Sequence, residues 1–192
     1  MRAQEKERTR GEILAAAREV LKEKGAEHLT SRAVAERAKV AVGTVFLHFP
    51  TTIALFEALL DDQLGLALPR AIATVRGRAL VPRLCHVARC LFESYDVDPA
   101  LSKLCLAHTI VASERGDPRL SELSAWVVSE VQGAIDRGLI EPMEPKLAFL
   151  CFFSLYFTLL VAGLRGEFGR DQQLELLKAG LERLFPRRSR SS

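Results

Sequence analysis

The chain has 192 residues, of which 48% are hydrophobic and 27% are charged. Both fractions are close to the globular average and exclude a disordered chain, while twelve glycines and eight prolines are too few for a collagenous or low-complexity protein. The length allows one ordinary domain, or a small domain followed by a larger one.

The formal net charge of +3 is distributed unevenly along the chain. Residues 1–50 hold ten Lys or Arg and seven Asp or Glu, a net charge of +3. Residues 51–169 hold eleven and fourteen, and residues 170–192 hold six and three. The basic amino-terminal segment, followed by an acidic central segment, predicts that residues 1–50 bind a polyanion.

Helical periodicity dominates the sequence, and no convincing alternating strand interrupts it, which predicts an all-α fold. The first helix is expected over residues 9–24, or from a turn or more before Thr9, and its apolar residues repeat with a helical period from Ile13 to Leu21. Thr9 and Glu12 have the spacing of a capping box. Gly25 then follows as a C-cap that can take a positive φ.

Two short helices come next, separated by a turn of three residues. Thr30 is a good N-cap for Ser31–Ala38, and Val42–His48 follows with Val45 and Phe49 as inward anchors. A longer helix before two short ones is a helix-turn-helix pattern, whose second short helix is narrow enough for the DNA major groove. We therefore expect residues 1–50 to form a three-helix DNA-binding domain.

Residues 51–192 are expected to form a larger helical domain. Thr51 or Thr52 caps its first helix, and several prolines mark helix boundaries or first turns. The predicted helices are 52–76, 80–96, 99–112, 117–137, 144–166 and 170–185, and residues 186–192 form a frayed basic tail.

A specific series of residues runs through the amino-terminal part. It consists of ILAAA from Ile13, VAERA from Val34 and GTVFLHFP from Gly43, followed by Leu55-Phe56. In order and spacing, residues 11–56 resemble the TetR family of bacterial repressors. The resemblance implies a helix-turn-helix domain followed by a ligand-binding and dimerisation domain, although the rest of the chain matches only in helix number and length.

The resemblance also implies roles for single residues. Gly43 allows close approach to DNA, Thr44 contacts phosphate or a base edge, and Phe46 occupies a position where the family usually has a phosphate-contacting Tyr. Val42 and Leu47 can contact thymine methyl groups, and Arg32 is the best polar candidate for a base edge. The expected DNA-binding residues are Thr30, Arg32, Lys39, Val42, Gly43, Thr44, Phe46, Leu47 and His48.

The sequence departs from the family pattern at several of these positions. Lys39 stands where the family usually has Gly, so a conventional turn requires a positive φ at a cost of order 1 kcal/mol. Ala41 replaces the usual Ser or Thr cap, and Thr52-Ile53 replaces a frequent Lys-Glu pair. Phosphate contacts are therefore expected to be few, unless basic residues near the amino terminus supply them through the minor groove or backbone; these are Arg2, Lys6, Arg8 and Arg10.

Dimerisation follows from DNA geometry, because one short recognition helix contacts too few bases and a two-fold dimer reads two halves of a palindrome. The candidate interface is the apolar stretch 147–164 together with a leucine stripe on the last helix. Core packing inside one subunit is the alternative for the same residues. The stripe consists of Leu174, Leu177, Leu181 and Leu184.

Polar side chains within apolar helices indicate a pocket for a small apolar or aromatic effector. We expect Arg89, His108 and Glu130 to orient this effector, and aromatic residues to wall the cavity. The candidate ligand-binding residues are Arg89, Phe92, His108, Trp126, Glu130, Phe153 and Phe157. Ordinary core packing is the alternative for each aromatic residue.

The four cysteines do not have the spacing of metal ligands, so no metal or other cofactor is expected. The first residues also lack the apolar core of a signal peptide. We therefore expect free thiols in a cytoplasmic protein. A thiol-based redox regulator of the same fold is an alternative, in which Cys90 meets Cys105 and Arg89 lowers the pKa of a neighbouring thiol. A helical interaction module with weak DNA binding is another.

Residues 147–164 form an uncharged stretch at the lower length limit of a membrane span. We expect a buried helix and no membrane partner, because the rest of the chain is typical of a soluble protein. An enzyme is not expected, because the common catalytic motifs GxSxG, HExxH, the P-loop and the dinucleotide fingerprint are missing.

Overall fold

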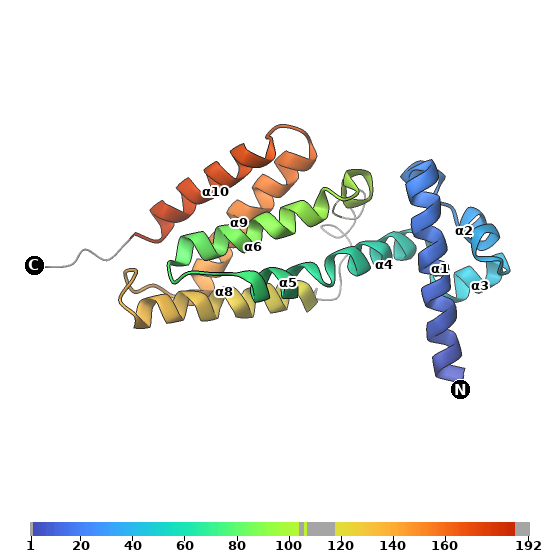
Figure 1. The fold of residues 1–192 in the computed structure, drawn as a ribbon, viewed down its shortest axis with the longest axis horizontal. Coiled ribbons are helices and arrows are strands. Elements are labelled where there is room, and N and C mark those ends of the chain that lie inside the picture. The colour runs from blue at the N-terminus through green and yellow to red at the C-terminus, as the bar shows by residue number, and fades with distance from the viewer. Residues whose placement is uncertain (1, 104–105, 107–117, 187–192) are drawn as a thin grey trace, which may run out of the picture. The chain divides into compact units, whose positions relative to one another are not determined.

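The computed structural model describes residues 2–103, residue 106 and residues 118–186 (Figure 1). Their helices are α1 (Arg2–Lys24), α2 (Ser31–Ala38), α3 (Val42–His48), α4 (Thr52–Leu64), α5 (Ala67–Thr74), α6 (Leu80–Tyr95), α8 (Pro118–Asp136), α9 (Pro145–Leu164) and α10 (Arg170–Leu184). A 3-10 turn, η1 (Ala26–His28), links α1 to α2. The expected all-α fold is confirmed.

The described residues form two compact units. The first runs to Gln63 and includes a short stretch from Asp98, while the second consists of Leu64–Val97 and the described residues from Pro118 onward. By packing, α4 belongs with the first unit, where the guanidinium of Arg18 in α1 pairs with Asp62. The functional division into residues 1–50 and 51–192 remains a prediction.

The helix α1 has the earlier of the two starts that the sequence allowed. It starts at Arg2, so Thr9 lies inside it and its hydroxyl donates to the carbonyl of Glu5 at 3.0 Å. The predicted Thr9–Glu12 capping box is therefore wrong, because residues 2–8 contain good helix formers and no breaker. At the other end, Gly25 takes a φ of 85°, as predicted.

The two short helices have the predicted bounds. The N–H of Ala33 donates to Thr30 Oγ1 at 3.1 Å, which confirms the N-cap of α2. On the far side of α3, the N–H of Ala54 donates to Thr51 Oγ1 at 3.0 Å, so Thr51 caps α4. Arg37 of α2 donates hydrogen bonds to Glu19 and Glu23 of α1 and so joins the two helices. The hydrogen bond from Arg37 to Glu23 lowers the pKa of Glu23.

The predicted helix 52–76 is interrupted. α4 ends at Leu64, and α5 begins at Ala67 after a turn at Gly65 and Leu66. Pro69 explains the interruption: it lies in the first turn of α5, where no backbone N–H is needed, whereas a continuous helix would need one. The helices predicted at 80–96, 117–137, 144–166 and 170–185 are confirmed to within two residues at each end, while most of 99–112 lies outside the described residues.

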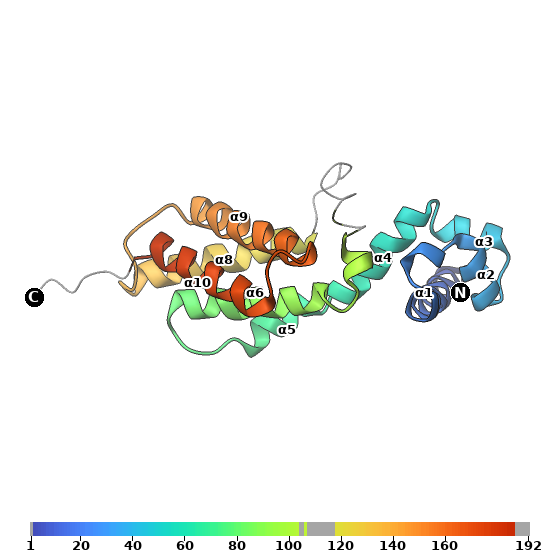
Figure 2. The same cartoon turned by 90° about the horizontal axis from the view of Figure 1, so that it is seen from above.

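In the second unit, α10 lies beside α9 and α6, and α9 also packs on α8 (Figure 2). A close approach joins α9 to α10, because the amide of Gln173 crosses Gly163 and donates to the carbonyl of Leu159 at 2.5 Å. A Cβ on Gly163 would lie 1.9 Å from the Gln173 nitrogen. Leu177 and Leu181 are fully buried within this chain, so these two residues of the predicted dimer stripe belong to its own core.

The helix α9 is long and apolar enough to span a membrane, with a mean hydropathy of 2.3 over its most apolar window. Length and composition do not distinguish a span from a core helix. Eight of its residues are buried in the second unit, among them Phe152 and Leu160.

Candidate nucleic-acid interface and small-molecule cleft

The helix α3 has one buried side and one exposed apolar side. Val45 is fully buried, and Phe49 at the end of the helix is nearly so. On the opposite side, Val42 is 38%, Phe46 48% and Leu47 73% exposed. Two inward anchors hold this short helix to the domain, which leaves its other face available to a partner.

Gly43 lies in the middle of this exposed face. A Cβ built on it meets no atom within 4 Å, and its φ is not positive. Glycine inside a helix costs about 0.5–1 kcal/mol relative to Ala, and nothing in the packing requires it here. Gly43 therefore leaves open space on the exposed face of α3.

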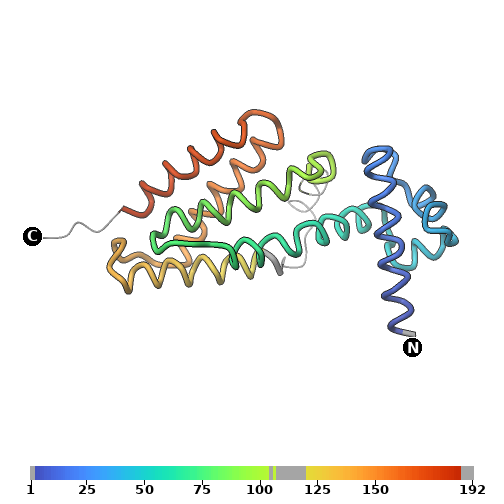
Figure 3. The backbone as a smooth tube through the Cα atoms, in the orientation of Figure 1, coloured from blue at the N-terminus to red at the C-terminus, as the bar shows by residue number. Residues whose placement is uncertain are grey.

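The turn before α3 is strained as the sequence predicted. Figure 3 traces the backbone of this amino-terminal part in blue. Lys39 adopts φ 57° and ψ 40°, and among the described residues it is the one non-glycine with a positive φ. Ala41, at the N-cap of α3, provides no side-chain hydrogen bond. Both predictions about these departures are confirmed, and both features reduce the intrinsic stability of the turn and helix.

Two exposed cations flank α3. Arg32 in α2 and Lys39 in the turn have no ion-pair partner among residues 2–103, 106 and 118–186. Arg37 pairs with Glu19 and Glu23, and Arg10 lies over the Phe49 ring at 5.1 Å. Arg32 and Lys39 are therefore available to a phosphate backbone, while Glu36 of α2 is an exposed carboxylate on the same helix as Arg32.

The polar side chains of α3 lie toward its buried side. Thr44 and His48 are half-buried, and His48 Nδ1 is buried without a hydrogen-bond partner in the described part of the chain. Thr30 is exposed, but its oxygen already caps α2.

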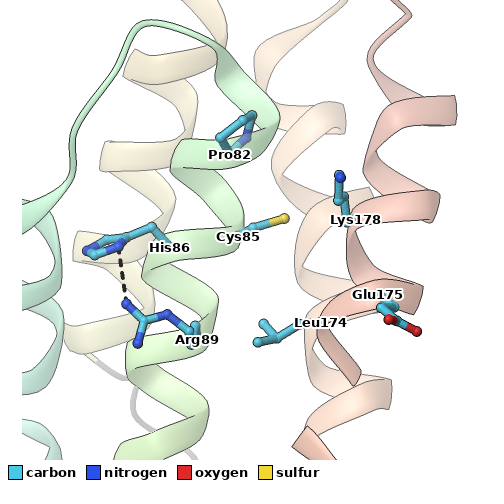
Figure 4. A pocket seen from close by; sticks show the side chains of 7 residues that line it. All are labelled: Pro82, Cys85, His86, Arg89, Leu174, Glu175 and Lys178. Carbon is cyan, nitrogen blue, oxygen red and sulfur yellow. Dashed lines mark hydrogen bonds between the residues drawn. The ribbon is translucent and has the colours of Figure 1, made fainter. Parts of the chain in front are cut away.

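A cleft of about 370 Å³ lies between α6 and α10 in the second unit (Figure 4). Arg89 lines this cleft and donates to His86 Nδ1 at 3.4 Å and to Glu93 at 2.7 Å. Apart from Arg89, none of the predicted ligand-binding residues that the structure describes lines this cleft. The other residues that line it are Pro82, Cys85, His86, Leu174, Glu175 and Lys178.

Glu130 does not meet Arg89. Its two carboxylate oxygens accept from Arg83 at 2.6 Å each, and the side chains of this pair are only 15% and 19% exposed. The hydrogen bond from Arg83 to Glu130 raises the pKa of Arg83. The two residues are 47 positions apart, so helical periodicity contains no signal for their pairing.

The predicted aromatic residues are distributed over two environments. Phe92 is fully buried, stacks on Tyr156 with centroids 5.0 Å apart, and has the Arg170 guanidinium 4.8 Å above its ring. Phe153 and Phe157 stack at 5.6 Å along α9 and remain half-buried. Trp126 on α8 is also half-buried, and His108 lies outside the described residues.

The described cysteines, Cys85, Cys90 and Cys151, are free. Burial raises the pKa of Cys85 to about 11, although nearby Lys178 opposes the shift. Burial also raises the pKa of Cys90 more than Arg89 lowers it. The predicted activation of a thiol by Arg89 is therefore wrong for Cys90, and the predicted meeting of Cys90 with Cys105 lies outside the described residues.

Comparison with known proteins agrees with this geometry. Residues 13–59 match the family described as bacterial regulatory proteins, tetR family. No curated protein matches the sequence.

Solved structures resemble the chain over nearly its whole length. RolR in complex with the ligand resorcinol is 20% identical, with 96% of this chain and 90% of RolR covered and a TM-score of 0.66. A TetR transcriptional regulator from Rhodococcus sp. RHA1 is 24% identical, with 94% and 97% covered and a TM-score of 0.63. A protein studied for control of antibiotic production by bacterial hormones is 18% identical, with 94% and 98% covered and a TM-score of 0.67.

Identities below 25% establish the fold, and the match over residues 13–59 establishes the type of amino-terminal domain. Residues 13–59 therefore match the tetR family of bacterial regulatory proteins, and the chain as a whole has the fold of solved TetR-family transcriptional regulators.

Proposed function

We propose that the protein is a cytoplasmic, non-enzymatic repressor that binds a palindromic operator as a homodimer and releases it when a small apolar or aromatic effector binds. The observation that carries the DNA-binding part is the exposed face of α3 around Gly43, flanked by the unpaired cations Arg32 and Lys39. A helix that keeps one side free beside positive charge suits insertion into the major groove.

Dimerisation is supported by apolar surface on α9 and α10. Leu147 is 53% and Leu150 58% exposed, although both belong to the most apolar helix of the chain. An open groove of about 540 Å³ continues this surface, and Leu150, Cys151, Ser154, Leu155, Gly180, Arg183 and Leu184 line it. We assign this face to the subunit interface, because exposed apolar patches of this kind are typical of protein contacts.

The effector site is assigned to the second unit. Phe153, Phe157 and Trp126 are half-buried, and we assign the aromatic contacts of the effector to them. Glu130 can orient a ligand only after releasing Arg83, and the role proposed for His108 rests on the sequence alone. RolR was solved with the aromatic ligand resorcinol, which supports an aromatic effector for this fold. The effector acts through its difference in affinity between the DNA-bound and released states.

Selection of random duplexes on the purified protein tests the DNA-binding proposal. We expect a palindrome, and a plot of log K against log salt whose slope is about −0.9 for each phosphate neutralised. Arg32→Ala should weaken binding, whereas Leu139→Ala, which truncates an exposed leucine of the second unit, should not. Weak binding without sequence preference would contradict the proposal.

Sedimentation tests the subunit interface separately. Leu150→Arg places a charge on the exposed part of α9 and should convert a dimer to a monomer, while Leu139→Arg serves as the matched control. A wild-type monomer at micromolar concentration, or a dimer unaffected by Leu150→Arg, would contradict this assignment.

The raised thiol pKa values do not favour the redox-regulator alternative. We expect hydrogen peroxide to leave operator affinity unchanged, both in the wild type and in a variant with serine at all four cysteines. A peroxide response that the serine variant lacks would establish thiol sensing instead.

A further inference from the structure

The face that α3 presents to solvent contains no side chain able to hydrogen-bond a base. At 100° per residue, Val42, Phe46, Gly43 and Leu47 fall within one arc of the helix, and all four are exposed. The two polar residues, Thr44 and His48, are half-buried toward the other side. Arg, Asn and Gln, which make the usual paired hydrogen bonds to purine edges, do not occur in α3.

The major groove offers few partners to such a face. Guanine and adenine present acceptors and an amino group there, cytosine presents an amino group, and thymine presents an acceptor and its C5 methyl. The methyl group is the one apolar group among these base edges. Apolar contact with it is therefore the base recognition that Val42 and Leu47 can perform.

Gly43 makes this contact sterically feasible. It separates the two apolar side chains on the exposed arc, and no atom of the chain lies within 4 Å of the position where its Cβ would be. Without a side chain at residue 43, the helix backbone can approach the base edges closely enough for van der Waals contact.

We propose that α3 recognises its operator through thymine methyl groups, with Leu47 as the principal contact and Val42 as the second. The proposal rests on the repressor function proposed above and specifies which chemical group in the operator carries the sequence information. Arg32 and Lys39 then supply phosphate attraction that positions the helix.

Replacement of thymine by deoxyuridine tests this directly, because it removes the methyl group and keeps the base pair. In the selected operator, each thymine of one half-site is replaced in turn, then at both symmetric positions, and affinity is measured by fluorescence anisotropy. At the best position we expect about fourfold weaker binding per methyl group, and about 15-fold weaker binding when both half-sites are changed.

The variant Leu47→Ala tests whether Leu47 is the residue that contacts the thymine methyl group. The 15-fold preference for thymine over deoxyuridine should fall below about threefold in this variant, with Val42→Ala showing a smaller loss. Because Leu47 is 73% exposed, the variant should fold as the wild type does. The matched control Leu139→Ala should keep the full preference.

The outcomes separate this inference from the proposed function. A selected palindrome whose affinity is unchanged by deoxyuridine overturns the inference and leaves the repressor function intact. A deoxyuridine effect of equal size in wild type and in Leu47→Ala also overturns it, since the methyl group then acts through DNA shape. Failure to select any sequence overturns both proposals.

Discussion

The helices α3 and α9 are both rich in apolar residues, yet they are built in opposite ways. α9 has twenty residues, begins with Pro145 behind a capping Glu144, and buries eight side chains. α3 has seven residues, begins behind Ala41 without a side-chain cap, and buries one. Apolar composition therefore means core in one helix and an exposed surface in the other.

The segment around α3 lacks several features that stabilise a helix, whereas α9 has them. Around α3, a non-glycine residue has a positive φ, the cap is missing, a glycine occupies open space, and large apolar side chains face solvent. At α9 the cap is present and the glycine is packed. Local rules that are broken together at one place are typical of functional sites. The predictions below compare matched positions in the two helices.

The largest difference is expected between two phenylalanines. Phe152→Ala in α9 should lower the free energy of unfolding by about 3–5 kcal/mol, because Phe152 is fully buried and stacks on Tyr156. Phe46→Ala in α3 should change it by less than about 0.5 kcal/mol. Urea unfolding followed by circular dichroism measures both values, and equal losses would refute the contrast.

The two glycines should respond with opposite signs. Gly163→Ala drives a methyl group into the buried Gln173 amide and should cost about 1–3 kcal/mol. Gly43→Ala meets no neighbouring atom and should stabilise the protein by about 0.4–1 kcal/mol while weakening operator binding. Thermal unfolding and anisotropy on the same preparations measure the two effects. Unchanged operator affinity in Gly43→Ala would show that DNA does not approach this residue.

The N-caps of α9 and α3 should change the free energy of unfolding by similar amounts. Glu144 accepts from the Leu147 N–H at 2.5 Å, so Glu144→Ala should cost about 1 kcal/mol. Ala41→Ser supplies the cap that α3 lacks and should stabilise by about 1 kcal/mol. Both changes are measured by urea unfolding. A destabilised Ala41→Ser variant would show that the start of α3 is constrained in some other way.

The smallest effect on unfolding is expected at the turn. Lys39→Gly relieves the positive φ and should stabilise by up to about 1 kcal/mol. If Lys39 neutralises one phosphate in each half-site, the variant should also reduce the magnitude of the salt slope by about 1.8 for the dimer. An unchanged slope would remove Lys39 from the DNA contacts and leave its conformation unexplained.

Much of the first unit could be predicted from sequence because its signals are local. The bounds of α2 and α3, the cap at Thr30 and the strained φ of Lys39 follow from residues within one or two turns of each position. The sequence left the start of α1 open, because Thr9 and Glu12 have the spacing of a cap while the residues before them continue the helix. A capping motif permits a helix start but does not require one.

The sequence by itself determined the helical class, the helix-turn-helix and the exposed apolar face of α3, because period, caps and breakers act over a few residues. The tertiary structure decided the partners. It paired Glu130 with Arg83 rather than leaving it for a ligand, buried Leu177 and Leu181 within the chain, and left Leu150 exposed. These contacts form between helices that are far apart in the sequence. Helical periodicity predicts which residues share a face of a helix, but it does not predict what that face packs against.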